Sequence, residues 1–389
     1  MQPMEIKKGV YWVGAVDWGL RNFHGYSTER GSTYNAYLIV DEKIALVDTV
    51  KHYLFPEMLE RIRSIVDPSR IDVIISNHVE MDHSGSLPKI LKICPKAQII
   101  TSVNGEKGLK KHYDTTGWNI RAVNSGDQIS LGGHTPTFVH TQMVHWPDSM
   151  VTYIPEKELL LSNDAFGQHV ASTQKFEDEL GWDIAKEEAA KYYANIVLPY
   201  GQQVNKALDV LSTLKIDMIA PSHGIIWRSN IKELLALYRK WANNATTRRS
   251  VVVYDSMWGS TAAMAGAIVE AFDLKGIPAK PMDLKTVHIS DVMAEVLEAE
   301  FICVGSPTLN NGMLPTVAGF LSYMKGLAPK NRRGLAFGSY GWGGQSLGLI
   351  EEQLKSCGMN TFESVKHQYV PDTAALAVMT ERVKEMLDD

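Results

Sequence analysis

The sequence predicts two domains in tandem, a mixed domain of helices and strands followed by a doubly wound α/β domain. Its 389 residues exceed the roughly 100–200 residues of one ordinary domain, so two or three hydrophobic cores are expected. Up to about residue 240, strands end in loops that carry histidine or aspartate, and from Ser250 onward strands and helices alternate strictly. A polar stretch at 243–250 separates the two patterns. We therefore place the domains at residues 1–247 and 248–389.

Composition and charge narrow the class of protein. Hydrophobic residues make up 45% and charged residues 21% of the chain, as in ordinary globular proteins. The net charge of −5 argues against a nucleic-acid partner. The N-terminus has no apolar leader and no apolar run approaches the roughly 18 residues of a membrane span, so we expect a cytoplasmic protein with no membrane partner. The three cysteines, Cys94, Cys303 and Cys357, are too far apart for a cysteine-ligated metal, which leaves histidine and carboxylate ligands.

In the first domain, alternating apolar residues predict strands at 11–16, 34–40 and 43–48, and a helical period predicts a helix at 54–65. Four further predicted strands lead directly into polar side chains. They begin at Ile71, Pro136, Leu159 and Ile216. Because catalytic side chains of layered folds lie on loops at strand ends, these four loops are candidates for one site.

The strongest local motif follows the first of these strands and reads His78-Val-Glu80-Met-Asp82-His83. Four potential ligands within six residues converge on a small volume only if a cation compensates their charge. The alternative is a solvated polar loop with an aspartate that caps a helix. That alternative does not explain why ligand-type residues recur at other strand ends, namely His145, Asp164 and His223.

In this order and at these spacings, the seven side chains resemble the metallo-β-lactamase-like fold, an αββα sandwich with two metals at one edge. Hydrolases of that fold usually carry a histidine where this chain has Glu80. Three carboxylates, Glu80, Asp82 and Asp164, make a harder and more anionic site, which suits iron or manganese better than zinc. We therefore expect redox chemistry rather than hydrolysis by a metal-bound hydroxide.

The second domain is predicted to contain five strand–helix units. Strands are expected at 251–254, around Ala279, at 301–305, at 334–338 and around Phe362. Helices are expected to begin at Thr261, Asp291, Pro315, Gln345 and Thr373. Five such units form a doubly wound parallel sheet.

The loop at 256–261 lies between the first strand and the first helix of this sheet and is a candidate phosphate site. Hydroxyls and backbone N–H groups at a helix N-terminus bind anions without a lysine. The Walker lysine and the G-x-G-x-x-G fingerprint are both absent here, which argues against a triphosphate or a dinucleotide and fits the phosphomonoester of FMN. A plain Ser/Thr helix cap is the alternative.

Two further loops follow the third and fourth strands, at the edge where a doubly wound sheet binds its ligand. Tyr340 and Trp342 in the last loop are placed to flank an isoalloxazine ring. All three loops resemble those of flavodoxin. The expected FMN-binding residues are Ser256, Met257, Trp258, Gly259, Ser260, Thr261, Ser306, Pro307, Thr308, Leu309, Asn310, Asn311, Ser339, Tyr340, Gly341, Trp342, Gly343 and Gly344.

The combination of the two domains resembles the flavodiiron proteins, also called A-type flavoproteins, along the whole chain. This resemblance implies reduction of O2 to water, of NO to N2O, or of both, by two non-haem iron ions with electrons relayed through FMN. It implies one iron held by His78, Glu80 and His145 and a second held by Asp82, His83 and His223. Asp164 would bridge the two irons, and whether His83 or a water completes the second site stays open.

The same resemblance implies partners. Family members form head-to-tail homodimers in which the FMN of one chain faces the irons of the other, and dimers of dimers are an open alternative. Because the chain carries no rubredoxin or flavin-reductase extension, electrons are expected from a separate donor, either rubredoxin or a reduced deazaflavin. Four residues are candidates for donating a proton or a hydrogen bond to the bound gas, although each is equally explained as a hydrogen-bonded interior residue: His24, Tyr26, His169 and Tyr193.

Two other functions compete with this interpretation. One is a zinc hydrolase of the metallo-β-lactamase-like fold fused to a flavodoxin domain, and Glu80 argues against it. The other is a flavin electron carrier whose first domain only dimerises, and the complete set of seven ligand-type residues argues against that. The zinc and iron contents of the protein distinguish the three.

Overall fold

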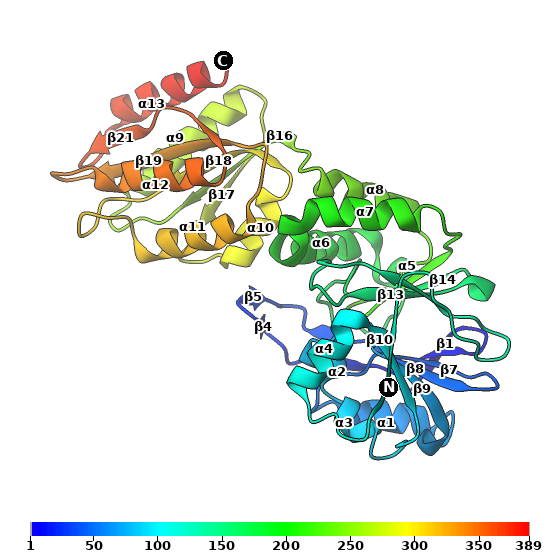
Figure 1. The fold of residues 1–389 in the computed structure, drawn as a ribbon. Coiled ribbons are helices and arrows are strands. Elements are labelled where there is room, and N and C mark those ends of the chain that lie inside the picture. Colours follow the sequence, from blue (N-terminus) through cyan, green and yellow to red (C-terminus); the bar gives the residue numbers. More distant parts are fainter. Residues whose placement is uncertain (1, 389) are drawn as a thin grey trace. The chain divides into compact units, whose positions relative to one another are not determined.

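The computed structural model describes residues 2–388 (Figure 1). By its internal contacts the chain divides into two compact units. The first unit comprises the residues through His24, Thr28–Tyr192 and Gln202–Arg239. The second comprises Gly25–Ser27, Tyr193–Gly201 and the chain from Lys240 onward. Two short segments therefore belong to the second unit although their neighbours in sequence belong to the first.

One sheet of the first unit has seven strands in the order β1-β2-β7-β8-β9-β10-β11. These are β1 (Met4–Lys7), β2 (Val10–Trp12), β7 (Tyr37–Ile39), β8 (Ile44–Val47), β9 (Ile71–Ile75), β10 (Gln98–Ser102) and β11 (Asn119–Val123). The pairs from β1 to β8 are antiparallel, and those from β8 to β11 are parallel.

The strands predicted at 11–16 and 34–40 are each broken in two. Their outer halves, β3 (Ala15–Asp17) and β6 (Ser32–Tyr34), pair with each other as a separate ribbon. The break falls at Gly14, where a Cβ atom would lie 2.3 Å from the carbonyl oxygen of Tyr34. Only glycine lets the two chain segments approach this closely.

A second sheet of four strands has the order β12-β13-β14-β15. Its strands are β12 (Thr137–His140), β13 (Met150–Ile154), β14 (Leu159–Asn163) and β15 (Met218–Pro221). Helices α1 (Phe55–Arg63), α3 (Leu87–Ile90) and α4 (Val103–His112) lie outside the first sheet, and α6 (Trp182–Tyr192), α7 (Gly201–Leu211) and α8 (Ile231–Ala242) lie outside the second (Figure 1). Shorter elements are β4 (Asn22–Phe23), β5 (Tyr26–Ser27), α2 (Met81–Ser84) and α5 (Glu177–Leu180). The predicted αββα sandwich is confirmed.

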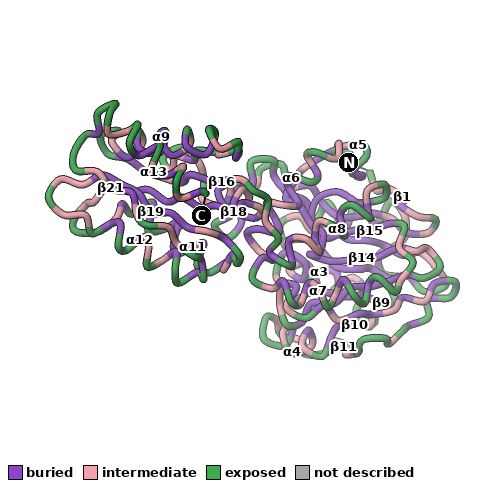
Figure 2. The backbone as a smooth tube through the Cα atoms, turned by 90° about the horizontal axis from the view of Figure 1, so that it is seen from above, coloured by how far each residue is buried: buried purple, intermediate pink, exposed green. Residues whose placement is uncertain are grey.

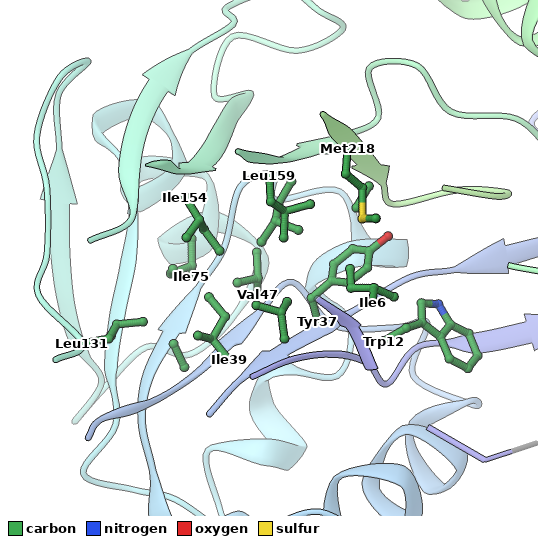
Figure 3. Close-up of a cluster of buried hydrophobic side chains, with 14 of the residues drawn as sticks. Ile6, Trp12, Tyr37, Ile39, Val47, Ile75, Leu131, Ile154, Leu159 and Met218 are labelled. Atoms are coloured by element: carbon green, nitrogen blue, oxygen red, sulfur yellow. The ribbon is translucent and has the colours of Figure 1, made fainter. Parts of the chain in front are cut away.

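Apolar side chains fill the space between the two sheets (Figure 3). Val47 and Ile75 from the first sheet meet Ile154 and Leu159 from the second, and all four are 0% exposed. A second core lies between the first sheet and its helices, with Met58 of α1 among its buried members. In Figure 2, stretches of buried residues run through both sheets of this unit. These two cores fix the strand ends from which the site loops project.

Replacing Leu159 with alanine is expected to lower the free energy of unfolding of this unit by about 2–5 kcal/mol, because it opens a cavity between the sheets. Urea unfolding followed by circular dichroism measures the change. Val210→Ala is the control, since Val210 on α7 is 45% exposed, and its effect is expected to stay within about 0.5 kcal/mol. Equally small losses for both variants would contradict the placement of Leu159 in the core.

The second unit contains a parallel sheet in the order β17-β16-β18-β19, with β20 and β21 both beside β19. The strands are β16 (Thr247–Tyr254), β17 (Ala279–Asp283), β18 (Ala299–Gly305), β19 (Arg333–Tyr340), β20 (Asn360–Thr361) and β21 (Val365–Gln368). Helices α9 (Ser260–Leu274) and α13 (Thr373–Met386) cover one face, and α10 (Ile289–Val296), α11 (Pro315–Leu327) and α12 (Gln345–Ser356) cover the other (Figure 1). The predicted doubly wound sheet is confirmed. Among the described residues, no helix is both long enough and apolar enough to cross a lipid bilayer.

The fifth strand of this sheet differs from the prediction. Phe362, around which this strand was predicted, lies between β20 and β21. Its ring stacks on Phe301 with 6.2 Å between centroids, and the guanidinium carbon of Arg333 lies 4.1 Å from its centroid. Phe362 is therefore a packing residue. The strand that reaches the ligand-binding edge is β21, which brings Tyr369 and Val370 to that edge.

Candidate metal centre and flavin cavity

The seven side chains predicted as metal ligands meet at one edge of the sandwich. His78 and Glu80 lie on the loop after β9, and Asp82 and His83 lie in the short helix α2 that follows it. The other three lie on loops after β12, β14 and β15 and are His145, Asp164 and His223. All seven fall into two groups whose donor atoms lie within 4.8 Å of one another.

The first group, here called the first subsite, consists of His78, Glu80 and His145 together with Asp164. His78 Nε2 lies 3.4 Å from Glu80 Oε2 and 3.5 Å from Asp164 Oδ2. His145 Nε2 lies 3.3 Å from each of the same two oxygens. Since metal–ligand bonds of about 2.0–2.2 Å place neighbouring ligand atoms roughly 3–3.5 Å apart, these atoms are spaced for one ion.

The second group, the second subsite, consists of Asp82, His83 and His223. His223 Nε2 lies 3.2 Å from Asp82 Oδ2, and His83 Nε2 lies 3.4 Å from Asp82 Oδ1. Asp164 Oδ1 also faces this subsite, at 3.0 Å from His83 Nε2 and 3.3 Å from His223 Nε2. Each oxygen of Asp164 therefore faces a different subsite.

These buried polar atoms are not satisfied by one another. Within the part of the chain that the structure describes, no hydrogen bond reaches Nε2 of His78 or His83, or either oxygen of Asp82 or Asp164. Buried polar groups are normally hydrogen-bonded, and leaving one unpaired costs about 1–3 kcal/mol. Two cations would satisfy all of these atoms together, so the donor set fits a dinuclear metal centre.

The pKa values of the cluster show how strongly its charges are coupled. Burial lowers the pKa of His145 and of His223, but the neighbouring carboxylates outweigh burial and raise the two values to about 9 and about 10. Burial raises the pKa of Asp164, and the surrounding imidazoles reverse this and hold it well below its usual range. These opposed pKa shifts arise because carboxylates and imidazoles of opposite charge lie close together, and a bound cation would take the place of the protons.

Contacts outside the cluster orient two of the imidazoles. Asp148 Oδ2 accepts hydrogen bonds from His78 Nδ1 at 2.9 Å and from the backbone N–H of Val79 at 2.8 Å. The carbonyl oxygen of Thr33 accepts a hydrogen bond from His223 Nδ1 at 2.8 Å. Both contacts leave Nε2 of the ring free to face the centre. Neither partner was predicted, and the only sequence signal for Asp148 is its position three residues after His145.

Two of the four predicted proton or hydrogen-bond donors lie beside the centre. His24 Nε2 is 3.4 Å from Glu80 Oε1, and the His24 side chain is 72% exposed. His169 is buried, with its ring centroid 5.0 Å from that of His223 and its Nδ1 2.8 Å from Ser32 Oγ.

The two predicted tyrosines are placed differently. Tyr26 is buried in β5, and the ring of Tyr193 lies 5.2 Å from that of Trp241. Both tyrosines belong to the second unit. Tyr192, the immediate neighbour, has its ring 6.1 Å from His223. The structure therefore places Tyr192 beside His223.

Two further side chains near the centre carried no sequence motif. Tyr34 is fully buried with its ring 5.6 Å from that of His223, and its hydroxyl has no hydrogen-bond partner among the described residues. Lys51 Nζ lies 4.5 Å from the ring centroid of Phe23 and 5.0 Å from that of Tyr34. These cation–π contacts hold a positive charge beside an anionic ligand set.

The three predicted loops of the second unit surround a cavity of about 740 Å³ at the carboxyl edge of the parallel sheet. This volume is typical of a small-molecule cofactor site. Gln345, Tyr369 and Val370 also line it, although they were not predicted. The predicted residues that line the cavity are Ser256, Met257, Trp258, Ser260, Pro307, Thr308, Leu309, Asn310, Asn311, Ser339, Tyr340, Gly341, Trp342 and Gly343.

The other four predicted residues of these loops do not line the cavity and shape the loops instead. Thr261 is fully buried, with Oγ1 3.1 Å from Ser339 Oγ. Ser306 is also fully buried. Gly259 has a φ of +91° directly before α9, a backbone conformation that favours glycine, and Gly344 caps α12.

The comparisons with known proteins match both domains of the chain. A family model described as ODP family beta lactamase matches residues 33–224, and a flavodoxin model matches residues 252–380. The chain is 46% identical over 359 residues to a nitric oxide reductase of Moorella thermoacetica, covering 91% of this chain and 90% of that protein. It is 41% identical over 396 residues to the rubredoxin-oxygen oxidoreductase of Megalodesulfovibrio gigas, covering 100% and 98%. The crystal structure of the flavodiiron protein from Giardia intestinalis superposes with a TM-score of 0.97 at 32% identity, covering 99% and 96%.

Fold and site together define a two-domain protein in which a β-lactamase-type domain with a carboxylate-rich ligand set precedes a flavodoxin domain. Relatives that match almost the whole chain are oxidoreductases, so the zinc hydrolase alternative is not favoured. The chain belongs to the flavodiiron protein family of oxidoreductases. The family resemblance inferred from the sequence is confirmed.

Proposed function

We propose that this chain reduces O2 to water, NO to N2O, or both, at a dinuclear iron centre that receives its electrons through FMN. The observation that carries the proposal is the placement of Asp164, whose two oxygens each face a separate group of donors. Three carboxylates among four imidazoles suit iron in its +2 and +3 states better than zinc. Relatives named for nitric oxide and for oxygen support both gases as substrates.

In this proposal His78, Glu80 and His145 would hold one iron, Asp82, His83 and His223 would hold the other, and Asp164 would offer one oxygen to each. When bound, the two irons and the FMN supply four electrons, as many as the reduction of one O2 to water requires. The protein contributes the position and charge of the ligands. Imidazoles with their Nε2 atoms turned inward and carboxylates that balance the cations would keep the centre assembled at this edge of the sandwich.

Both reductions consume protons, so the centre needs groups that hold a proton near the bound gas. We assign this role to His24 and His169, and to Tyr192 in place of Tyr193. His24 connects the centre with solvent, because its exposed side chain reaches Glu80. His169 is held by Ser32 against the second subsite, where its ring is positioned rather than mobile.

The flavin is assigned to the cavity of the second domain, for which we keep the bounds 248–389, with the metal domain at 1–247. The N-terminus of α9, with Ser260 at its first position, suits the phosphate of FMN because its backbone N–H groups and helix dipole attract anions. Tyr340 and Trp342 line the same cavity and suit the isoalloxazine ring.

The proposal includes a head-to-tail homodimer, in which the flavin of one chain approaches the irons of the other. Its support is the exposure of Trp258 and Trp342, each 93% exposed although each lines the flavin cavity. Exposed apolar surface of this kind marks an interaction site. A rubredoxin-type protein is the proposed donor, as the names of the relatives suggest, with a reduced deazaflavin as the alternative, and the proposed location is the cytoplasm.

Anaerobic purification followed by metal and flavin analysis tests this function. We expect two irons and one FMN per chain, and reoxidation of both the iron and the flavin of the reduced protein when it is mixed with O2 or with NO. The gas that reoxidises the protein faster is the preferred substrate. Zinc in place of iron, or flavin reoxidation at a rate that does not depend on iron content, would contradict the proposal.

A further inference from the structure

We propose that Asp148 makes the two metal subsites unequal, so that the first subsite binds its metal more tightly than the second. Asp148 is a positioning residue in this scheme, because it acts on the metal through His78. The inference rests on the proposed function, since it assumes that both subsites hold metal, and it adds the order in which they fill and empty.

The carboxylate of Asp148 is held rigidly against His78. It is buried, and one oxygen accepts hydrogen bonds from both the imidazole Nδ1 and the backbone N–H of Val79. Its own backbone is fixed as well, because Ser102 Oγ donates a hydrogen bond to the Asp148 carbonyl at 2.7 Å and Asn104 Nδ2 donates to the carbonyl of Pro147 at 3.1 Å. The carboxylate therefore cannot turn away from the ring without breaking several contacts.

The supported histidine of the second subsite has a weaker outer partner than His78 has. His223 Nδ1 donates to the carbonyl of Thr33, which is a neutral acceptor. His83 Nδ1 is buried and makes no hydrogen bond to any residue that the structure describes. Among the described residues, each subsite thus has one histidine with an outer partner, a carboxylate for His78 and a carbonyl for His223, and one histidine, His145 or His83, whose Nδ1 makes no hydrogen bond.

The difference between a carboxylate and a carbonyl as outer partner affects how tightly each subsite binds its metal. A carboxylate that accepts the Nδ1–H of an imidazole fixes the tautomer, orients the ring and makes Nε2 a stronger donor. Asp148 also places an extra negative charge one imidazole away from the first metal. Loss of such an outer partner typically weakens metal binding by about 10–100-fold. The first subsite should therefore fill first and empty last.

The variant Asp148→Asn tests this, because the amide keeps the shape of the side chain and removes its charge. We would dialyse the iron-loaded full-length protein against increasing chelator and measure the iron that remains per chain. The wild-type protein is expected to lose its irons in two separate steps. In Asp148→Asn, the more tightly bound iron should be lost at a chelator concentration about 10–100-fold lower than in the wild-type protein. Mössbauer spectra of this variant should show one of the two iron signals altered.

The chain offers a matched control in Asp41→Asn. Asp41 Oδ2 lies 2.6 Å from His134 Nδ1, and Asp41 Oδ1 accepts the backbone N–H of Gly133 at 3.1 Å. This carboxylate–imidazole pair has the same chemistry and lies in the same unit, but neither residue belongs to the ligand set. Asp41→Asn is expected to leave both steps and both iron signals unchanged.

A measurement on the wild-type protein does not depend on the folding of any variant. Metal-free protein supplied with one equivalent of iron should show the Mössbauer signal of one subsite only. Equal population of both signals at one equivalent would overturn the inference, as would an Asp148→Asn protein that matches wild type in its chelator steps and spectra. A wild-type protein that binds no iron contradicts the proposed function itself, whereas two bound irons of equal affinity contradict only the inequality.

Discussion

Asp164→Ala is expected to abolish iron binding and reductase activity while FMN stays bound. Asp164 is the residue that faces both subsites, with Oδ2 toward His78 and His145 and Oδ1 toward His83 and His223. Its removal takes a ligand from each metal and leaves the buried imidazoles without a shared counter-charge. Turnover with O2 and with NO should fall by more than the roughly 10–100-fold that loss of an outer partner costs. Iron and FMN per chain are measured on the same sample.

Two further variants control this result. Asp164→Asn keeps the shape and removes the charge, and it should also lose iron. Glu177→Gln changes another fully buried carboxylate of the same unit, one whose oxygens accept backbone N–H groups of residues 228–230. We expect it to keep its iron. If Asp164→Ala retained two irons with normal turnover, the bridging assignment would be wrong.

Gly338→Ala is expected to have the opposite outcome, with loss of FMN and retention of iron. Gly338 lies in β19, and a Cβ atom there would lie 2.0 Å from the carbonyl oxygen of Ser306. The clashing atom belongs to the backbone, so no side-chain rotation can relieve the clash. The loss in free energy of unfolding should therefore exceed the roughly 1–3 kcal/mol that ordinary overpacking costs. Two of the three flavin loops must then move apart. FMN per chain and thermal unfolding of the purified protein measure the effect.

The matched control is Gly348→Ala. Gly348 lies inside α12, and a Cβ atom there would meet no other atom within 4 Å. Alanine is a better helix former than glycine by about 0.5–1 kcal/mol, so this variant should be slightly more stable and keep its FMN. A Gly338→Ala protein that binds FMN like Gly348→Ala would contradict the close packing of these loops. Asp164→Ala and Gly338→Ala together assign each cofactor to its own domain.

Local motifs made much of both sites predictable. The His78 to His83 cluster is compact in sequence, and the structure does bring it together with His145, Asp164 and His223. The flavin loops were predictable because they follow the strands of a regular parallel sheet. Tyr369 and Val370 were missed because the last strand was expected around Phe362, an apolar residue that packs on Phe301 instead.

Other features depend on geometry that the sequence does not encode locally. At the end of α6 the backbone changes to a π-helical turn over Tyr193–Val197, which alters the direction in which successive side chains point. Tyr192 is the last residue of α6 and Tyr193 is the first residue of that turn. Thr33 acts through its backbone carbonyl, which no side-chain motif reveals.

The exposed tryptophans of the flavin loops provide an optical signal. Trp12, Trp227 and Trp241 are among the largest fully buried side chains, whereas Trp258 and Trp342 are each 93% exposed and line the flavin cavity. Buried indoles emit at shorter wavelength than hydrated ones, so the red edge of the fluorescence spectrum belongs largely to Trp258 and Trp342, with a smaller share from Trp18 of the first unit, which is 53% exposed. Flavin added to the apoprotein should quench this red emission first. Binding of flavin to the second domain can therefore be followed in real time, without isotopes and without any turnover of the metal centre.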